Sequence, residues 1–253
     1  INGINVQYDM GEARFGQVRG TSADLSSVTV NGNRLPSAEG DTRNVQLDLI
    51  PADMVQTIEV SKVVTSDMDG DAIGGAINLV TKNTPYDRVF NATVGTGYNA
   101  VSDKIQLNLG LTYGDRFFND KLGLMMAASY QNAPGGADNT EFEYDVDDDG
   151  KVFLDKAEVR QYYVTRERQS YSLATDYKFN PNHKISFKGI YNRRSDWENR
   201  YRITYKKLNE DPSKQSVVLQ TKGGSGDNKD ARLELQQTMD FMLDGEHTFG
   251  RLN

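Results

Sequence analysis

From about Val89 onward, apolar residues recur at every second position, and this alternation constrains the fold more than any other feature of the chain. In the segment 105–113, isoleucine, leucine and tyrosine occupy the odd positions, while amides, glycine and threonine occupy the even ones. The same period of two returns at 122–130, 171–179 and 231–243. Such a period places alternate side chains on opposite faces of a β-strand. The sequence therefore predicts a series of strands with one apolar and one polar face.

Two architectures share this alternation, a soluble β-sandwich and a transmembrane β-barrel. Strand length favours the barrel, because the alternation around 184–206 is far longer than the usual strand of about 5–6 residues. Aromatic residues near the ends of the expected strands also favour it, because they are typical of the girdles at membrane interfaces. These residues are Phe117, Phe118, Tyr130, Tyr177 and Phe179.

The expected connections alternate between short and long, as in outer-membrane barrels. Segments 180–183 and 244–247 are predicted to be tight turns, and about 132–166 and 207–228 are predicted to be long, polar outer loops. In this arrangement the leucines face lipid and the polar positions face the lumen. The expected lipid-facing residues are Leu107, Leu109, Leu111, Leu124, Leu173 and Leu235, and the expected lumenal ones are Gln106, Asn108, Asp176 and Glu234.

Composition narrows the function classes. The formal net charge is -7 and no basic tract stands out, which argues against a nucleic-acid partner. No run of about 18 apolar residues exists, so a transmembrane helix is not expected, whereas a strand crosses a bilayer with about ten residues. The chain has no cysteine and does not begin with methionine. We expect it to be an internal piece of a longer protein.

The first 86 residues differ in character and predict a small α+β unit. Asn31-Gly32 follows a β-branched run, which is a strong hairpin signal because both turn positions need a positive φ. Pro51 is placed to begin a short helix. Strands are expected at 58–60 and 76–80, with Gly74 and Gly75 allowing a turn and a close backbone approach between them.

Four blocks of this region, 15–20, 28–36, 49–60 and 74–82, resemble in order and spacing the plug domain of TonB-dependent outer-membrane transporters. The resemblance implies a partial transmembrane β-barrel, about seven strands of an expected twenty-two, with an N-terminal α+β plug inside it. The plug would span 1–86 and the barrel strands 87–253. The residues that match the plug signature are Arg19, Gly20, Glu59, Lys62, Asp69, Asp71, Gly74, Gly75 and Asn78.

The same resemblance implies a function in the outer membrane of a Gram-negative bacterium. A plug-gated transporter of this family takes up a large substrate such as an oligosaccharide or a siderophore, and is energised by TonB with its inner-membrane motor proteins. The acidic form of the loop around Asp69 and Asp71 resembles a branch linked to carbohydrate uptake. Outer-membrane lipid and a surface lipoprotein are further implied partners. The alternative is a non-transporting receptor or scaffold barrel that anchors a surface lipoprotein or a secretion or adhesion complex.

One position departs from the family pattern. Many plugs carry arginine where Lys62 stands, and the resemblance implies that this residue and Arg19 face acidic residues of the barrel. Lysine keeps the charge but lacks the bidentate fork of arginine. Any acidic partners are expected in strands outside this chain.

A second acidic cluster predicts a calcium site in an outer loop. Asp145, Asp147 and Asp149 alternate before a glycine, as in the first half of an EF-hand loop, and Asp155 lies nearby. Lys156 stands where the bidentate acid is expected, so a solvated loop tip is the alternative. The same alternative applies to Asp67, Asp69 and Asp71.

No catalytic set is recognisable, and the two histidines, His183 and His247, both fall in predicted turns. We therefore expect no enzyme and no required cofactor.

Overall fold

The structure, a computed structural model, describes residues 2–9, 12–37, 45–66, 68, 70, 72–222 and 232–250. These residues form three β-sheets joined by turns and three short 3₁₀ helices. No helix within the described ranges is both long and apolar enough to cross a membrane.

The largest sheet has seven strands, all paired antiparallel, in the order β12-β11-β10-β9-β8-β7, with β13 also paired to β11. Its two last strands share one edge of β11: β12 pairs with residues 200–206 and β13 with residues 183–198. The strands are β7 Val89–Asn99, β8 Lys104–Phe117, β9 Leu122–Val146, β10 Val152–Asn180, β11 His183–Lys206, β12 Ser216–Lys222 and β13 Arg232–His247.

The described residues from 2 to 81, called here the N-terminal unit, contain the two smaller sheets. One is an antiparallel ribbon and the other is a four-stranded sheet in the order β4-β3-β6-β5, with β3 and β6 parallel. The strands are β1 Ile4–Asp9, β2 Glu12–Val18, β3 Ser26–Val30, β4 Asn33–Arg34, β5 Val55–Ser61 and β6 Gly75–Thr81. The 3₁₀ helices are η1 Ala23–Leu25, η2 Leu47–Leu49 and η3 Ala52–Met54.

Local sequence accounts for these small elements. The predicted hairpin between β3 and β4 is confirmed, with φ of 51° at Asn31 and 83° at Gly32. The strands expected at 58–60 and 76–80 are confirmed as parts of β5 and β6, which pair antiparallel. The helix expected after Pro51 is a single 3₁₀ turn, η3.

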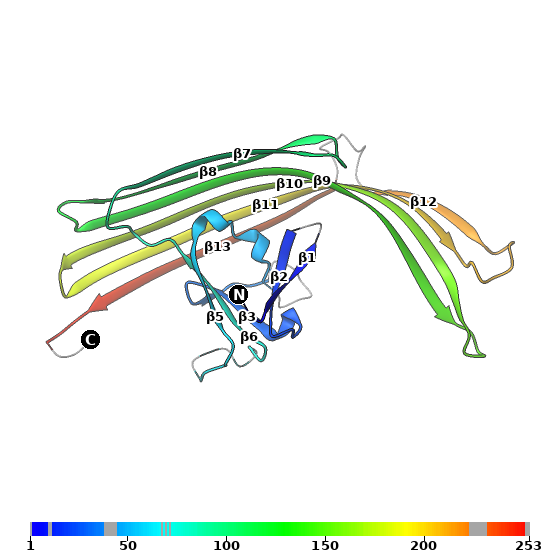
Figure 1. Cartoon of the computed structure of the whole chain (residues 1–253), viewed down its shortest axis with the longest axis horizontal. Coiled ribbons are helices and arrows are strands. Elements are labelled where there is room, and N and C mark those ends of the chain that lie inside the picture. Colours follow the sequence, from blue (N-terminus) through cyan, green and yellow to red (C-terminus); the bar gives the residue numbers. More distant parts are fainter. Residues whose placement is uncertain are drawn as a thin grey trace.

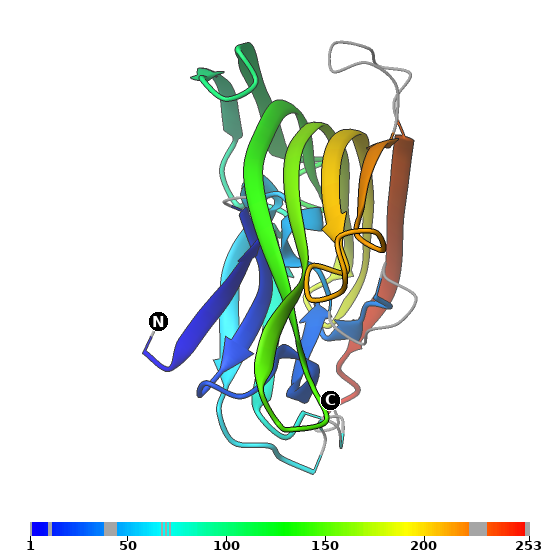
Figure 2. The same cartoon turned by 90° about the vertical axis from the view of Figure 1, so that its right-hand side faces the viewer.

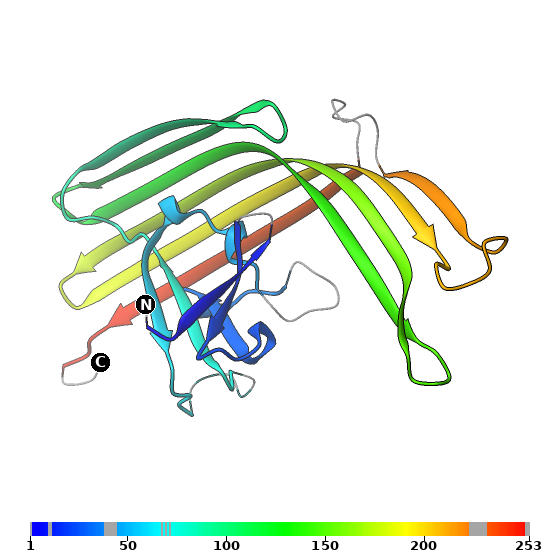
Figure 3. The same cartoon turned by 45° about the vertical axis from the view of Figure 1, so that its right-hand side comes forward.

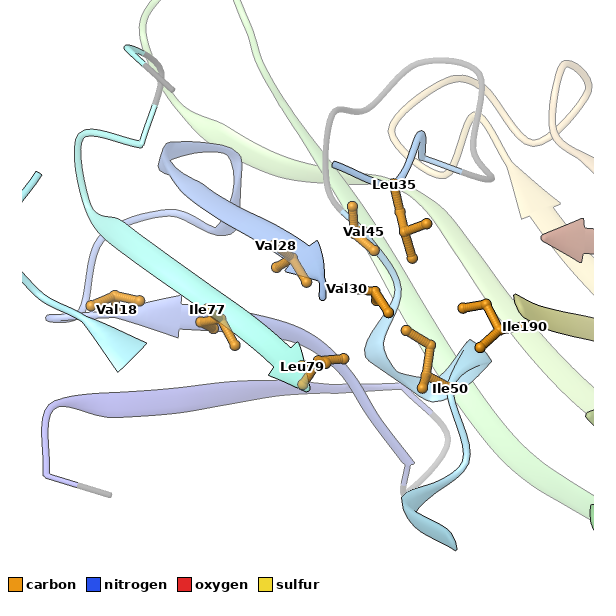
Figure 4. Close-up of a cluster of buried hydrophobic side chains, with 9 residues drawn as sticks. All are labelled: Val18, Val28, Val30, Leu35, Val45, Ile50, Ile77, Leu79 and Ile190. Atoms are coloured by element: carbon orange, nitrogen blue, oxygen red, sulfur yellow. The ribbon is translucent and has the colours of Figure 1, made fainter. Parts of the chain in front are cut away.

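The large sheet curves over the N-terminal unit, which lies on its concave side (Figures 1 and 2). The core of the N-terminal unit is a cluster of buried valine, leucine and isoleucine side chains (Figure 4). The large sheet contributes one buried member to this cluster, Ile190 of β11. In the described residues, this cluster therefore links the two parts by apolar packing at Ile190.

The convex face of the large sheet carries the apolar band that the alternation predicts. The register places Leu109 opposite Val94 and Tyr130, and Leu173 opposite Met126. Val94 and Leu243 are 78% and 75% exposed on this face. The six leucines expected to share a face do so. Asp176, expected on the opposite face, is 3% exposed on the concave side. The expected sharing of faces is thus confirmed.

Three predicted connections are wrong. The segment 132–166 is not a long loop, because β9 continues to Val146 and β10 begins at Val152, so the two strands satisfy each other's backbone hydrogen bonds in a hairpin. This hairpin projects beyond the N-terminal unit (Figure 3). In 207–228, β12 occupies 216–222, while the residues from 223 onward lie outside the described part. Segment 244–247 is not a turn, since β13 runs through it and Lys184 pairs with Glu246 at 3.0 Å.

Candidate functional site

A cluster of buried charges joins the N-terminal unit to the concave face of the large sheet. Three arginines come from the large sheet, Arg166 and Arg168 from β10 and Arg194 from β11. Even positions of these strands point towards the N-terminal unit, which brings the three guanidinium groups together across the β10–β11 ladder. We call this cluster, with the carboxylates of Glu12, Asp48 and Asp196, the arginine–carboxylate network.

Many short hydrogen bonds connect the side chains of this network. Arg168 binds Glu12 of β2 through two hydrogen bonds, of 2.9 Å to Oε1 and 2.5 Å to Oε2. Arg194 donates to Oδ2 of Asp48 at 2.7 Å and to Oδ2 of Asp196 at 2.7 Å. Arg166 also donates to Asp196, at 2.9 Å, and to Glu12. Charge-assisted, two-point contacts of this kind are among the strongest hydrogen bonds in proteins.

Burial raises the free-energy cost of losing any one of these contacts. The side chains of Arg194 and Asp48 are only 4% and 5% exposed. Buried charges are tolerated when they are paired, and removal of one partner is costly because the other is left without compensation. A network of balanced charges, three cations against three anions, therefore joins the N-terminal unit to the large sheet.

Glu12 makes this network sensitive to acid. Burial raises the pKa of Glu12, but hydrogen bonding and the charge of Arg168, followed by those of Arg166, outweigh it and lower the pKa to about 2 from 4.5. A depressed pKa contributes stability above the unfolded value, and this stability is lost as pH falls from about 4.5 towards 2. The full contribution corresponds to about 3 kcal/mol.

We expect the resistance of the N-terminal unit to protease to hold between pH 7 and 5 and to decline between about pH 4.5 and 3. Glu12→Gln should lower resistance at pH 7 and flatten this decline, because the titrating carboxylate is gone. Limited proteolysis across the pH range measures both effects. An identical pH profile in the two proteins would contradict the assignment.

A second ion pair fixes the connection between the N-terminal unit and β7. Arg116 of β8 donates to Asp176 of β10 through two hydrogen bonds, of 2.7 and 3.2 Å, and Thr84 of the connection donates to the same carboxylate. Arg88, four residues along, pairs with Asp115 at 2.7 Å. The connection is thus anchored where the chain enters the large sheet.

A cavity of about 430 Å³ lies beside the arginine–carboxylate network. Its lining comes from β2, β9, β10, β11 and β13, and includes Arg166, Arg194 and Asp196 of the network. The cavity therefore lies between the N-terminal unit and the part of the large sheet where β9, β10 and β11 continue beyond this unit.

Among the predicted signature residues, Arg19, Gly20, Gly74 and Gly75 lie together. Arg19 and Gly20 have positive φ values, of 56° and 72°. Arg19 Nε donates to the carbonyl of Gly74 at 3.1 Å. A Cβ on Gly75 would lie 2.6 Å from the carbonyl oxygen of Ser61, so the close approach expected at this glycine is present.

The implied contact of Arg19 with acidic residues of the barrel stays a prediction, because those residues are expected outside this chain. In the described part of the chain, its guanidinium donates to the carbonyls of Gly74 and Ile73 within the N-terminal unit. The turn at Arg19 directs the side chain back over the 73–74 segment. Lys62 lies beside Gly3, where an added Cβ would be 3.3 Å from its Nζ.

Asn78 and Glu59 form a separate polar group on the four-stranded sheet. Asn78 donates to Glu59 at 2.8 Å and accepts hydrogen bonds from Thr29 and from the backbone of Gly32. These contacts fix the β3–β4 turn. Asp67, Asp69 and Asp71, also singled out in the sequence, lie outside the described residues.

The predicted calcium ligands are not brought together. In the ranges that the structure describes, no three histidine, cysteine or acidic side chains are grouped so as to hold a metal ion. Asp147 instead accepts backbone hydrogen bonds from Asp149 and Lys151 in the β9–β10 turn, whereas Asp155 lies in β10. Calcium binding by Asp145, Asp147, Asp149 and Asp155 stays a prediction.

Comparisons with known proteins match the N-terminal unit to a known domain. Residues 1–76 match the sequence model of the family described as TonB-dependent Receptor Plug Domain. The ferric aerobactin receptor of Klebsiella pneumoniae is 28% identical over 167 residues, which cover 58% of this chain and 22% of the receptor. The N-terminal unit therefore resembles the plug domain of TonB-dependent receptors.

Solved structures give more distant matches. The ferric citrate transporter FecA in its unliganded form aligns with a TM-score of 0.44 and 15% identity, over 99% of this chain and 46% of that one. The siderophore receptor PirA from Pseudomonas aeruginosa aligns with a TM-score of 0.38 and 12% identity, over 98% and 56%. The chain spans about a fifth of the curated relative and about half of these solved chains.

Proposed function

We propose that this chain is the plug and the first part of the barrel wall of a TonB-dependent transporter in the outer membrane of a Gram-negative bacterium. The transporter takes up a large substrate, such as a siderophore or an oligosaccharide, and TonB with its inner-membrane motor proteins supplies the energy. The convex apolar band contacts outer-membrane lipid. A surface lipoprotein is a further partner in this proposal.

One observation carries the proposal: a plug domain of this family is docked by charged groups on the concave face of a sheet whose convex face is apolar. An apolar outer face and a polar inner face suit a wall between lipid and a wet lumen. When a plug held by ion pairs leaves its place in such a lumen, the charged groups of the plug and of the wall separate in water. Water and salt then solvate and screen these charges. The curated relative is a receptor for a ferric siderophore complex, as its name states.

A disulfide between plug and wall tests whether the plug must move. An added Cβ at Gly110 of β8 would lie 3.6 Å from Cγ of Asp53 in η3, the place that a cysteine sulfur would take. This separation suits a disulfide, and the chain has no native cysteine to compete. Cells carrying the intact transporter with Asp53→Cys and Gly110→Cys should bind substrate but not import it when oxidised. Reduction should restore uptake of ⁵⁵Fe supplied as ferric aerobactin, or of a labelled oligosaccharide.

A second readout needs no substrate. Ser170 is 1% exposed on the concave face, so a cysteine there should react with a maleimide only when the plug shifts. Labelling of Ser170→Cys should be faster in energised cells than after a protonophore, and the oxidised tether should suppress it. Each single cysteine variant is the control. Normal import and labelling with the tether closed would favour a route around the plug, whereas no import in either the oxidised or the reduced state would favour the non-transporting scaffold.

A further inference from the structure

The cavity beside the arginine–carboxylate network has an unusual lining for a neutral ligand. Six arginines line it, against three carboxylates, and Tyr162 is its single aromatic residue among the described side chains. The arginines are Arg14, Arg160, Arg166, Arg194, Arg200 and Arg232, and the carboxylates are Asp196, Glu198 and Glu234. A site for a neutral sugar would offer aromatic faces and amides, whereas guanidinium groups match carboxylates in shape and charge.

The carboxylates of the cavity are already engaged. Glu198 accepts hydrogen bonds from Tyr162 at 2.6 Å and from Arg232 at 2.8 Å, and Asp196 is held by Arg166 and Arg194. By contrast, Arg200 forms no ion pair within the described part of the chain. The lining therefore retains donors for an anion that comes from solution.

The arginines at the floor of the cavity bind the plug instead. Arg166 contacts Glu12, and Arg194 contacts Asp48, so two residues of the cavity lining have plug carboxylates as partners. The fit of Asp48 is incomplete, because its Oδ1 is buried with no hydrogen-bond partner among the described residues. When the plug moves, both carboxylates leave with it, and these arginines face the lumen.

We propose that the substrate carries several carboxylate groups, and that these groups replace Glu12 and Asp48 on the wall arginines. The inference rests on the proposed transport function and specifies its substrate class. The substrate first binds in the cavity through Arg200 and its neighbours. Its carboxylates then take over Arg166, Arg168 and Arg194 as the plug withdraws, which keeps these cations paired throughout.

Binding to the intact, detergent-solubilised protein tests this directly. The probes are tetragalacturonate, maltotetraose as its neutral counterpart of equal length, and citrate as a small tricarboxylate. We expect tetragalacturonate or citrate to bind and maltotetraose not to bind. The carboxylate that binds more tightly distinguishes an acidic oligosaccharide from a small hydroxycarboxylate complex.

Variants identify the cavity as the place of binding. Arg200→Gln should weaken binding of the carboxylate probe about tenfold, the value of one charge-assisted hydrogen bond, and Arg200→Lys should restore part of it. Lys184→Gln removes the same charge from the other end of β11 and should leave binding unchanged. Glu12→Gln should strengthen binding, because the competing plug carboxylate becomes neutral while the side chain keeps its shape.

Equal or tighter binding of maltotetraose, no binding of either carboxylate, or an unchanged affinity in Arg200→Gln would overturn the inference. These outcomes are separate from the tether experiment. If the tether blocks uptake but the carboxylates do not bind, transport stands and the substrate class is wrong. If the carboxylates bind but the tether has no effect, the site stands and the transport mechanism is wrong.

Discussion

Replacing Arg194 with methionine is expected to destabilise docking of the plug by about 3–5 kcal/mol, the cost of removing one partner from a buried ion pair. The methionine fills similar space, but Asp48 loses its 2.7 Å hydrogen bond and keeps only the longer, 3.4 Å contact with Arg168. Limited proteolysis across a series of denaturant concentrations measures this loss of stability, as a lower concentration at which half of the N-terminal unit is cleaved.

The control is Arg160→Met, which removes an arginine that is 25% exposed and pairs with Glu141 and Glu158 on the projecting hairpin. Neither carboxylate belongs to the plug, and Glu158 keeps its contacts with Lys156 and Arg202, so docking of the plug in this variant should remain close to the parent. Adding Asp48→Leu to Arg194→Met should recover part of the loss, because no unpaired carboxylate is then buried. Similar losses in Arg194→Met and Arg160→Met would show that the network does not hold the plug.

Leu109→Arg is expected to impair assembly of the wall far more than Asn108→Arg. The two positions are neighbours on β8, but Leu109 lies in the convex apolar band and Asn108 points to the concave side. With the convex face in lipid, an arginine near the midplane costs about 2–4 kcal/mol, whereas a lumenal arginine stays in water. The amount of folded, heat-modifiable protein in outer-membrane fractions measures the difference. Equal yields would show that neither face meets lipid.

The sequence predicted the strands well because a period of two is a local property of the backbone. The long hairpin between β9 and β10 was missed although a signal was present. Phe142, Tyr144 and Val146 alternate with acidic residues, but Pro134, Gly135 and Gly136 upstream suggested a loop. Backbone pairing between the two strands outweighs these weak strand formers.

The arginine–carboxylate network could be predicted only in part. Arg166 and Arg168 have the parity of the lumenal face, and Arg194 and Asp196 share it on the next strand, so an alternating arrangement of charges was readable. Their plug partners were not, because Glu12 and Asp48 lie more than a hundred residues away and their position depends on how the plug sits. The family resemblance places Arg19 and Lys62 against acidic residues expected outside this chain, and it gives no indication of the described interface, where the cations belong to the wall and the anions Glu12 and Asp48 to the plug.

The pairing of β1 has a mechanical consequence. β1 pairs only with β2 among the described strands, from Ile4 opposite Val18 at the open end to Asp9 opposite Glu12 at the tip. A load on the N-terminal side of β1 unzips this ribbon one pair at a time, and isolated two-stranded ribbons are marginally stable. The separation of β1 from β2 reaches the tip, where Glu12 lies, before the parallel β3–β6 pair bears tension. The first charged contact to yield is thus Glu12 with its arginines, while the core of the plug is still intact.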